Sequence, residues 1–363
     1  MMRVRLRERR GDEGRFTCDT RRMNPSDYHH RMDPANDPAT DGPQGPDTDV
    51  SKPWDKDNQA WWDWYVSLAD GEGEITTFEP APPLPDVPLP SDAEVIAELS
   101  RPYDLGEADV THFRDNGFVK LAGVFSPGAV LRLRGELVRL LTEAFGTDPD
   151  SGVQDRFLSL EMTWADHPLM RAYVLSPRVA HICAALLEVP AVRLYHDNVL
   201  SKQPGCGRTP WHFDDHHFPL DTHDVVTAWA PAQPIPLAMG PLAFAGPRSV
   251  WELVDGVAFE TSSTGYDRNV ARLFAEHGVA VDETPFEIGE VSFHHNLNFH
   301  NAARNRTDRS RIVLANTYYA DGARVVDAPT MVSGDWQKFM PGVEPGGLAA
   351  SALNPICWPV PDE

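Results

Sequence analysis

Cysteine is scarce in this chain of 363 residues, which contains only Cys18, Cys183, Cys206 and Cys357. No two of them have the paired spacing of a zinc knuckle, and scattered cysteines do not make a disulfide framework. We therefore expect a reducing, cytoplasmic setting. Long apolar runs are also missing, because no stretch approaches the roughly 18 apolar residues that a membrane-spanning helix needs.

Positive charge is in short supply as well. Lysine and arginine total 32 against 54 aspartate and glutamate residues, which gives a formal net charge of -22. We therefore expect neither nucleic acid nor an anionic membrane as a partner. An acidic surface chiefly favours solubility, and it also suits a cationic substrate. The sequence leaves the oligomeric state open.

Composition divides the chain into four segments. Residues 1–58 are predicted to be a disordered leader, because the arginine-rich start lacks the apolar run of a secretory signal and proline, aspartate and glycine follow it. Residues 59–90 form a short helix and a proline-rich connector. Residues 91–330 form the main domain. Residues 331–363 form a tail that either covers the active site as a lid or simply wraps the core.

An aromatic cluster begins the second segment. Trp61, Trp64, Tyr65 and Leu68 fall at i, i+3, i+4 and i+7, which is one apolar face of a helix. This helix is predicted either to dock on the core or to act as a flap that adds aromatic contacts near a pocket.

From Val192 onward, short segments rich in Val, Ile, Thr and aromatic residues alternate with Gly/Pro turns. The predicted strands cover 192–202, 208–214, 224–233, 241–246, 290–295 and 310–319. Helices are predicted at 128–145, 177–187 and 266–277. Many short strands with turn punctuation are typical of a sandwich or barrel. The predicted fold class is therefore α+β, with helices around a single β-domain.

The strongest chemical signal is Trp211-His-Phe-Asp214, followed much later by His300 and Arg311. His212 and Asp214 are two positions apart, so on a strand both side chains leave the same face. With His300 they make a set of two imidazoles and one carboxylate, which suits non-haem Fe(II). Arg311 begins an apolar strand, and we expect its guanidinium to reach inward as a fixed cation for a carboxylate-bearing co-substrate.

Other histidines compete for the role of ligand. His216 is four residues from His212, as in helical zinc sites, but Pro210 and Pro219 bracket a segment too short for a helix. A zinc protease is therefore disfavoured, and His223 is expected in a loop.

His294 and His295 end a predicted strand, so their side chains point to opposite faces. We expect one of them to donate a hydrogen bond to a metal ligand and the other to lie in the core.

A series of short motifs follows in order between residues 105 and 325. They are Phe113-Arg-Asp-Asn-Gly-Phe-Val119, Lys202-Gln-Pro-Gly205, Trp211-His-Phe-Asp214, Thr227-Ala-Trp229, Met239-Gly-Pro-Leu242, Gly246-Pro-Arg-Ser249, Gly289-Glu-Val-Ser-Phe293, His300, Asn305-Arg-Thr307 and Arg311. In this order the chain resembles the phytanoyl-CoA dioxygenase-like family of Fe(II)/2-oxoglutarate-dependent oxygenases.

The resemblance implies a double-stranded β-helix of the jelly-roll or cupin-like type, with flanking helices. It implies that His212, Asp214 and His300 hold Fe(II) and that Arg311 binds the distal carboxylate of 2-oxoglutarate. Trp229 would line the same pocket, and Asn198 would offer the co-substrate a polar contact. The implied reaction uses dioxygen, releases succinate and carbon dioxide, and hydroxylates a C–H bond of the substrate.

Three positions depart from the family pattern. Phe213 stands in the middle of the iron motif, where glutamine is usual, so a co-substrate contact is lost or comes from elsewhere. Ala302 stands where a small hydroxyl residue is common, and Gly246-Pro-Arg-Ser249 replaces the usual Pro-Gly-Ser-His. Asp214 is retained, which disfavours the halogenase variant, since a halide needs that ligand position vacant.

The motifs do not name the substrate. A small secondary metabolite, with an amine group suggested by the acidic surface, is preferred over a coenzyme A thioester. Two alternatives stay open: a cupin-like enzyme that uses another metal without 2-oxoglutarate, and a catalytically silent barrel that acts as a binding module. A buried Arg311 would favour the oxygenase over the first, and an intact ligand set would favour it over the second.

Overall fold

The computed structural model describes residues 59–69, 71, 75, 77–152, 155–254, 257, 263–329 and 336–360. The predicted leader, residues 1–58, lies outside the described residues. Within the described ranges, no helix is both long enough and apolar enough to cross a membrane.

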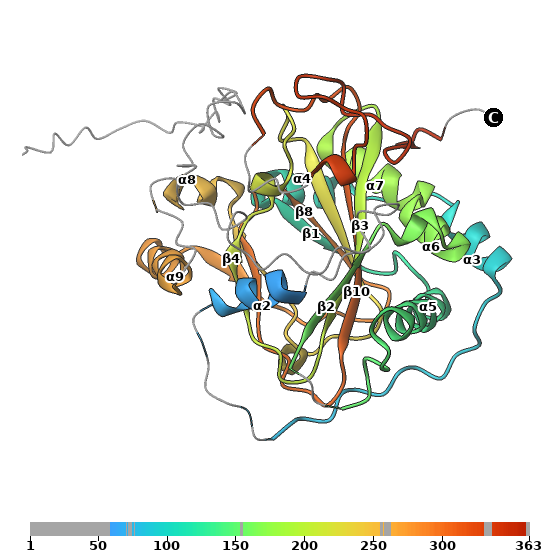
Figure 1. Cartoon of the computed structure of the whole chain (residues 1–363), viewed down its shortest axis with the longest axis vertical. Coiled ribbons are helices and arrows are strands. Elements are labelled where there is room, and N and C mark those ends of the chain that lie inside the picture. The colour runs from blue at the N-terminus through green and yellow to red at the C-terminus, as the bar shows by residue number, and fades with distance from the viewer. Residues whose placement is uncertain are drawn as a thin grey trace, which may run out of the picture.

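Two antiparallel sheets face each other and form the core (Figure 1). The large sheet has the order β1-β8-β5-β10-β3-β11, with β2 also paired to β3, and the small sheet has the order β4-β9-β6-β7. The strands of the large sheet are β1 (Phe118–Leu121), β2 (Phe157–Glu161), β3 (Val192–Lys202), β5 (Val225–Pro231), β8 (Val291–His295), β10 (Arg311–Ala320) and β11 (Ile356–Trp358). Those of the small sheet are β4 (Thr209–His212), β6 (Leu242–Gly246), β7 (Ala280–Asp282) and β9 (His300–Ala302).

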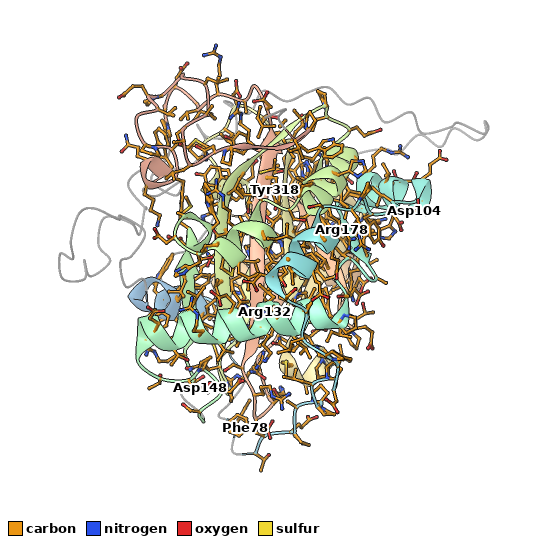
Figure 2. The ribbon with its side chains drawn as sticks, turned by 90° about the vertical axis from the view of Figure 1, so that its right-hand side faces the viewer. Phe78, Asp104, Arg132, Asp148, Arg178 and Tyr318 are labelled. Atoms are coloured by element: carbon orange, nitrogen blue, oxygen red, sulfur yellow. The ribbon has the colours of Figure 1, made fainter. Side chains whose placement is uncertain are left out.

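Helices cover the outer sides of this sandwich (Figure 1). They are α2 (Gln59–Ser67), α3 (Asp92–Leu99), α4 (Glu107–Asn116), α5 (Pro127–Phe145), α6 (Pro168–Val174), α7 (Pro177–Leu187), α8 (Trp251–Val254) and α9 (Gly265–His277). Figure 2 shows α5 lying lengthwise across the side of the large sheet, with Arg132 on it and Tyr318 of β10 beyond. The hydroxyl of Tyr318 donates to the carbonyl of Val174 at 2.7 Å, which ties β10 to the helix layer.

Local sequence signals explain the long helices. Ser126 caps α5 by accepting a hydrogen bond from the Ala129 amide, and Pro127 occupies the first helical position, where its missing N–H costs nothing. Ser176 and Pro177 start α7 in the same way. The apolar faces of both helices are buried. Both segments are therefore helical because their first residues cap the helix and one face of each packs into the core.

The predicted fold class is confirmed, and most element boundaries fall within two residues of their predicted positions. The strand predicted at 208–214 is wrong at its end, because β4 stops at His212. The amides of Asp214 and Asp215 both donate to the carbonyl of Asn296, at 2.8 and 3.1 Å. These bonds turn the chain away from β9 and into the 3₁₀ turn Asp215–His217.

The C-terminal tail is built into the fold where it is described. β11 pairs with the edge of β3, and Trp336, Phe339 and Met340 are buried in the main hydrophobic cluster. Lys338 forms an ion pair with Glu161 of β2 at 2.7 Å. The described part of the tail therefore extends the large sheet and packs into its hydrophobic cluster.

Candidate metal centre

Strand pairing brings His212 and His300 together. The two residues are direct partners in the antiparallel β4–β9 ladder, and their ring centroids are 4.1 Å apart. Asp214 follows β4 by two residues, and its Oδ1 lies 3.7 Å from the Nε2 atom of each histidine. One ligand atom from each of the three residues lies within 4.8 Å of the others, so the three could hold one metal ion.

Both imidazoles are oriented for metal binding. Nδ1 of His212 faces the carbonyl of Pro210 at 2.8 Å, and Nδ1 of His300 faces the carbonyl of Asn298 at 3.1 Å. Because a carbonyl only accepts, Nδ1 carries the proton and the Nε2 lone pair is left for a cation. Burial lowers the pKa of both histidines, so both are neutral at physiological pH.

Asp214 is held as a carboxylate. Burial raises its pKa, but His300 and His294 beside it lower the pKa more, and the net shift is well below the usual value. Its position is fixed by the neighbouring Asp215, whose Oδ1 accepts hydrogen bonds from Asn296 (2.6 Å) and His223 (2.8 Å). Two neutral imidazoles and one carboxylate suit a divalent cation such as Fe(II).

His294 and His295 point to opposite faces of the sheet, as expected. Nε2 of His294 lies 3.4 Å from Oδ2 of Asp214, on the side of the sheet that faces the metal centre. His295 points the other way, where Nε2 lies 2.6 Å from an Arg248 guanidinium nitrogen. The loop position predicted for His223 is also confirmed.

Arg311 is fully buried and reaches inward from the start of β10, as predicted. Its guanidinium lies 5.3 Å from the ring centroid of Trp229 and donates to the carbonyl of Gly240. Gly240 has φ +74, and a Cβ there would lie 2.2 Å from the Ala303 carbonyl oxygen, so the motif needs glycine at this position.

No carboxylate pairs with Arg311 in the described part of the chain, and its Nε has no hydrogen-bond partner there. Burial lowers its pKa to about 10, so it remains charged at neutral pH. A buried cation without an anion is costly, by several kcal/mol. The site therefore fits a ligand that brings a carboxylate.

Strand register places two further residues near Arg311. Lys202, its direct partner on β3, is completely buried and donates to the Thr209 hydroxyl at 3.2 Å and the Ala303 carbonyl at 3.0 Å. Asn198 lies further along the same inner face of β3, and its Oδ1 has no partner among the described residues. Trp229 and Asn198 are both in register with Ala315, so they share the interior with Arg311.

Phe213 and Ala302 offer no polar contact. Phe213 packs against Phe299, with ring centroids 4.9 Å apart, in the apolar cluster between the small sheet and α9. Ala302 lies in the cluster that includes Trp229. The contact that glutamine gives the co-substrate in the family pattern is thus absent at position 213. Lys202 and Asn198 are polar side chains that share the interior with Arg311.

Helix α2 lies against the edges of both sheets, in contact with β2 and β4. Trp62 stacks on Phe157 of β2 with centroids 4.2 Å apart, and its indole N–H donates to Ser159 at 2.6 Å. Tyr65 meets the ring of His212 edge-on at 5.7 Å. The helix was predicted, and Tyr65 and Leu68 of its predicted apolar face are buried. Trp62 was not part of that predicted face.

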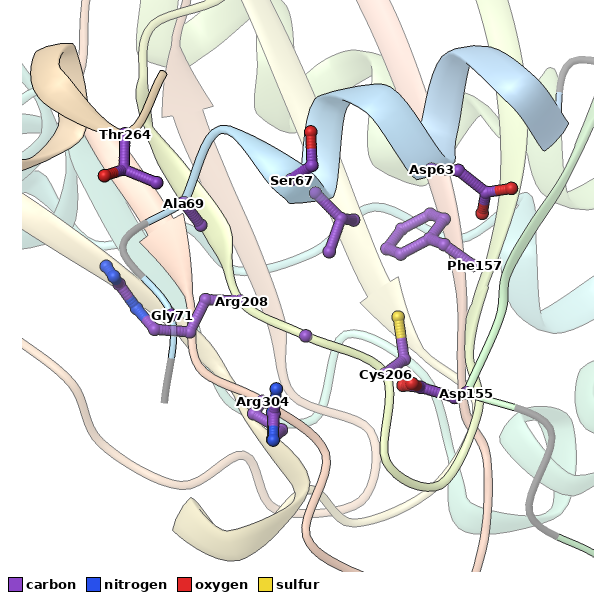
Figure 3. Close-up of a pocket in the computed structure, with 12 residues that line it drawn as sticks. Asp63, Ser67, Ala69, Gly71, Asp155, Phe157, Cys206, Arg208, Thr264 and Arg304 are labelled. Atoms are coloured by element: carbon purple, nitrogen blue, oxygen red, sulfur yellow. The ribbon is translucent and has the colours of Figure 1, made fainter. Parts of the chain in front are cut away.

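A cavity of about 430 Å³ lies on another side of α2 (Figure 3). Arg208 and Arg304 line it on one side, and Asp63 and Asp155 line it on the other. The three candidate metal ligands do not line this cavity, so it is separate from the candidate metal centre.

The facing sheets and the ligand set define a class of protein: a non-haem iron, 2-oxoglutarate-dependent oxygenase on a jelly-roll core. Residues 113–313 match the family model described as phytanoyl-CoA dioxygenase (PhyH), and the chain belongs to this family. The comparison with curated proteins finds no match.

Three solved structures illustrate the similarity of the fold. The chain is similar to the non-haem α-ketoglutarate-dependent epimerase SnoN from nogalamycin biosynthesis, with 21% identity, TM-score 0.55, and coverage of 69% of this chain and 98% of that one. The carbocyclase SnoK from the same biosynthesis gives 22% identity, TM-score 0.55, and coverage of 70% and 99%. EctD from S. alaskensis, solved with 2-oxoglutarate and 5-hydroxyectoine, gives 18%, 0.54, and coverage of 78% and 95%.

Proposed function

We propose that this protein hydroxylates a C–H bond of a small metabolite. In this proposal His212, Asp214 and His300 hold Fe(II), and Arg311 anchors the distal carboxylate of 2-oxoglutarate. The observation that carries it is the buried, charged Arg311 with no anion beside it among the described residues, in the same interior as the three ligands.

The side chains of the protein bind the metal and the co-substrate, orient them and shield them from water. The Nδ1 hydrogen bonds of His212 and His300 keep both Nε2 atoms aimed at one point. Arg311 and Trp229 fix one end of the co-substrate by a charged hydrogen bond and by packing. Tyr65 covers the ring of His212 and helps to exclude water. When bound, Fe(II) and 2-oxoglutarate supply oxidising power from dioxygen, with release of succinate and carbon dioxide.

An enzyme that uses another metal without a co-substrate is the second candidate. Nothing in such a reaction would balance the charge of Arg311, whereas a carboxylate of 2-oxoglutarate does so. A silent barrel is disfavoured because the ligand atoms are held ready by specific hydrogen bonds. The acidic surface suggested a substrate that carries an amine. Surface charge does not describe the interior of the protein, where the substrate binds.

Anaerobic titration of the metal-free protein tests the proposal. Adding Fe(II) and then 2-oxoglutarate should produce the weak metal-to-ligand charge-transfer band of the chelated complex. Asp214→Ala should abolish iron binding and the band, while Asp115→Ala, an exposed carboxylate at the end of α4, should change neither. Iron binding without a band after 2-oxoglutarate is added would favour the second candidate.

A further inference from the structure

Two rows of side chains face each other across the interior. Strand register places Phe118, His294, Thr227, Thr317 and His196 side by side across β1, β8, β5, β10 and β3 of the large sheet. On the small sheet, Phe244, His300 and His212 form the opposite row across β6, β9 and β4. The candidate metal ligands thus lie opposite a row that contains three polar residues with no role assigned so far, Thr227, Thr317 and His196.

Aromatic contacts join the rows at one end. Phe118 stacks on Phe244 with centroids 4.7 Å apart, and the ring of His294 lies 4.5 Å from that of His300. Towards the other end, His196 keeps part of its surface exposed, although its neighbour Asp197 is completely buried on the opposite face of β3. His212 is also only half-buried. The interior at the His196 end of the row is therefore accessible in part, although Phe339 packs against the His196 ring with centroids 4.7 Å apart.

This end of the row lies away from the co-substrate anchor. Arg311 and Thr317 are six residues apart on β10, which corresponds to about 20 Å of strand. A co-substrate anchored on Arg311 would approach the metal from that end of the strand. The face formed by Thr227, Thr317 and His196 is then left for the substrate.

These three residues have hydrogen-bonding capacity to spare. The hydroxyls of Thr227 and Thr317 bond to each other at 3.0 Å, which uses one of their two O–H groups. No acceptor for the second O–H occurs among the described residues, and both side chains are buried. Nδ1 of His196 likewise has no partner there. Buried polar groups are normally satisfied, so unmet groups in an accessible interior indicate a ligand.

The three residues also carry no charge. Burial, and then Lys338 nearby, lower the pKa of His196 to about 3, so its ring is neutral at physiological pH. Of the nearby carboxylates, Asp214 belongs to the metal set and Glu161 is paired with Lys338. An ammonium group would find no free carboxylate here among the described residues. A hydroxyl group, which both donates and accepts, matches two hydroxyls and a neutral imidazole.

We propose that Thr227, Thr317 and His196 form a substrate-binding wall that recognises an uncharged, hydroxyl-bearing part of the substrate and sets which C–H bond faces the metal. This proposal rests on the proposed function, since it places the substrate opposite the iron ligands. It revises the amine-bearing substrate expected from the surface charge.

The test uses the protein loaded anaerobically with Fe(II) and 2-oxoglutarate. Neutral probes are methyl α-D-glucopyranoside, methyl α-D-galactopyranoside and myo-inositol. Charged probes are the 2-amino-2-deoxy analogue of the glucoside and D-glucuronate. The change in the charge-transfer band on adding each probe reports binding next to the metal. The neutral probes should change the band, and the charged ones should do so at least about tenfold more weakly.

Variants locate the contact. Thr227→Val, Thr317→Val and His196→Phe should each weaken binding of the neutral probes about tenfold and leave iron and 2-oxoglutarate binding unchanged. Thr227→Ser and His196→Gln keep a donor and an acceptor and should restore most of the binding. Thr142→Val on α5, whose hydroxyl bonds only to its own helix at 2.7 Å, is the matched control. A thermal melt of each variant separates lost binding from lost folding.

Three results would contradict the proposed substrate-binding wall. They are no response to any neutral probe, a response only to charged probes, and unchanged binding of the neutral probes in the valine and phenylalanine variants. If Thr227→Val does not fold, His196→Phe and its glutamine counterpart decide the question, because His196 is outside the threonine pair. Absence of the band before any probe is added would instead count against the proposed function itself, so the two failures are distinguishable.

Discussion

His294 holds the far oxygen of the Asp214 carboxylate. Its Nε2 lies 3.4 Å from Oδ2, whereas Oδ1 lies 3.7 Å from the Nε2 atoms of His212 and His300. The two oxygens of one carboxylate thus face different partners. His294 keeps the carboxylate turned so that Oδ1 points to the metal position, and it does this from the large sheet while the histidine ligands come from the small one.

The first prediction concerns this contact. His294→Phe keeps a ring of similar size but removes the hydrogen bond, so Fe(II) affinity should fall about 10- to 100-fold, as for other residues that orient a metal ligand. His294→Gln can still donate and should recover part of the affinity. The measurement is anaerobic Fe(II) titration, with His277→Phe at the exposed end of α9 as the control. Equal affinities of the wild type and His294→Phe would remove His294 from this role.

The second prediction separates co-substrate binding from metal binding. Arg311→Met keeps much of the buried volume but loses the charge, so the affinity for 2-oxoglutarate should fall about 30-fold or more, while Fe(II) affinity stays the same. Arg311→Lys should recover little, because an ammonium lacks the planar fork that binds a carboxylate bidentately. Arg139→Met, an exposed residue on α5, is the control. A parallel loss of iron affinity would show that Arg311 acts on the whole fold.

The third prediction concerns the docking of α2. Trp62 is its anchor on β2, and Cys206, which lines the cavity beside α2, is buried in the intact protein. Burial raises the pKa of the Cys206 thiol to about 11, which keeps it unreactive. Trp62→Ala should therefore speed the labelling of Cys206 by a thiol reagent by tenfold or more.

Labelling is followed by peptide mass spectrometry in a Cys18→Ser background, so that the modified cysteine is identified. Cys183 and Cys357, buried elsewhere, report any general loosening. Faster labelling of all three would point to unfolding, and unchanged labelling of Cys206 would mean that Trp62 does not hold α2 in place.

Much of the fold and of the ligand set follows from local pattern. Enrichment in Val, Ile, Thr and aromatic residues between Gly/Pro turns located β3 to the residue. The His212–Asp214 spacing was informative even though β4 ends at His212, since the 3₁₀ turn keeps Asp214 on the same side. The start of α5 was predicted within one position and the start of α7 to the residue.

The parts that the sequence did not predict depend on register between distant strands. The wall formed by Thr227, Thr317 and His196 exists because three strands align, and an irregularity between Thr317 and Tyr318 shifts the alignment beyond that point. A single sequence does not reveal such a shift. The contact of Trp62 was missed for a similar reason, because its partner Phe157 is far away in the chain.

The last prediction uses a buried acid on the outward face of β3. Asp197 is fully buried, and its Oδ2 accepts hydrogen bonds from the Thr163 amide (2.9 Å) and hydroxyl (2.5 Å). Burial raises its pKa to about 6, above the ordinary value. The folded state therefore holds this proton more tightly than the unfolded state does. The resulting stability is present below about pH 4 and is lost as the pH rises through 6.

Asp197→Asn removes this titration but keeps an acceptor for Thr163. Relative to the variant, the wild type should lose about 2 kcal/mol of unfolding free energy between pH 4.5 and 7.5. Urea unfolding of both proteins across this range measures the difference, with Asp115→Asn as an exposed control whose difference from the wild type should stay flat. If the Asp197→Asn difference is equally flat, the carboxyl does not titrate near 6, and the hydrogen bonds from Thr163 outweigh the cost of burying its charge.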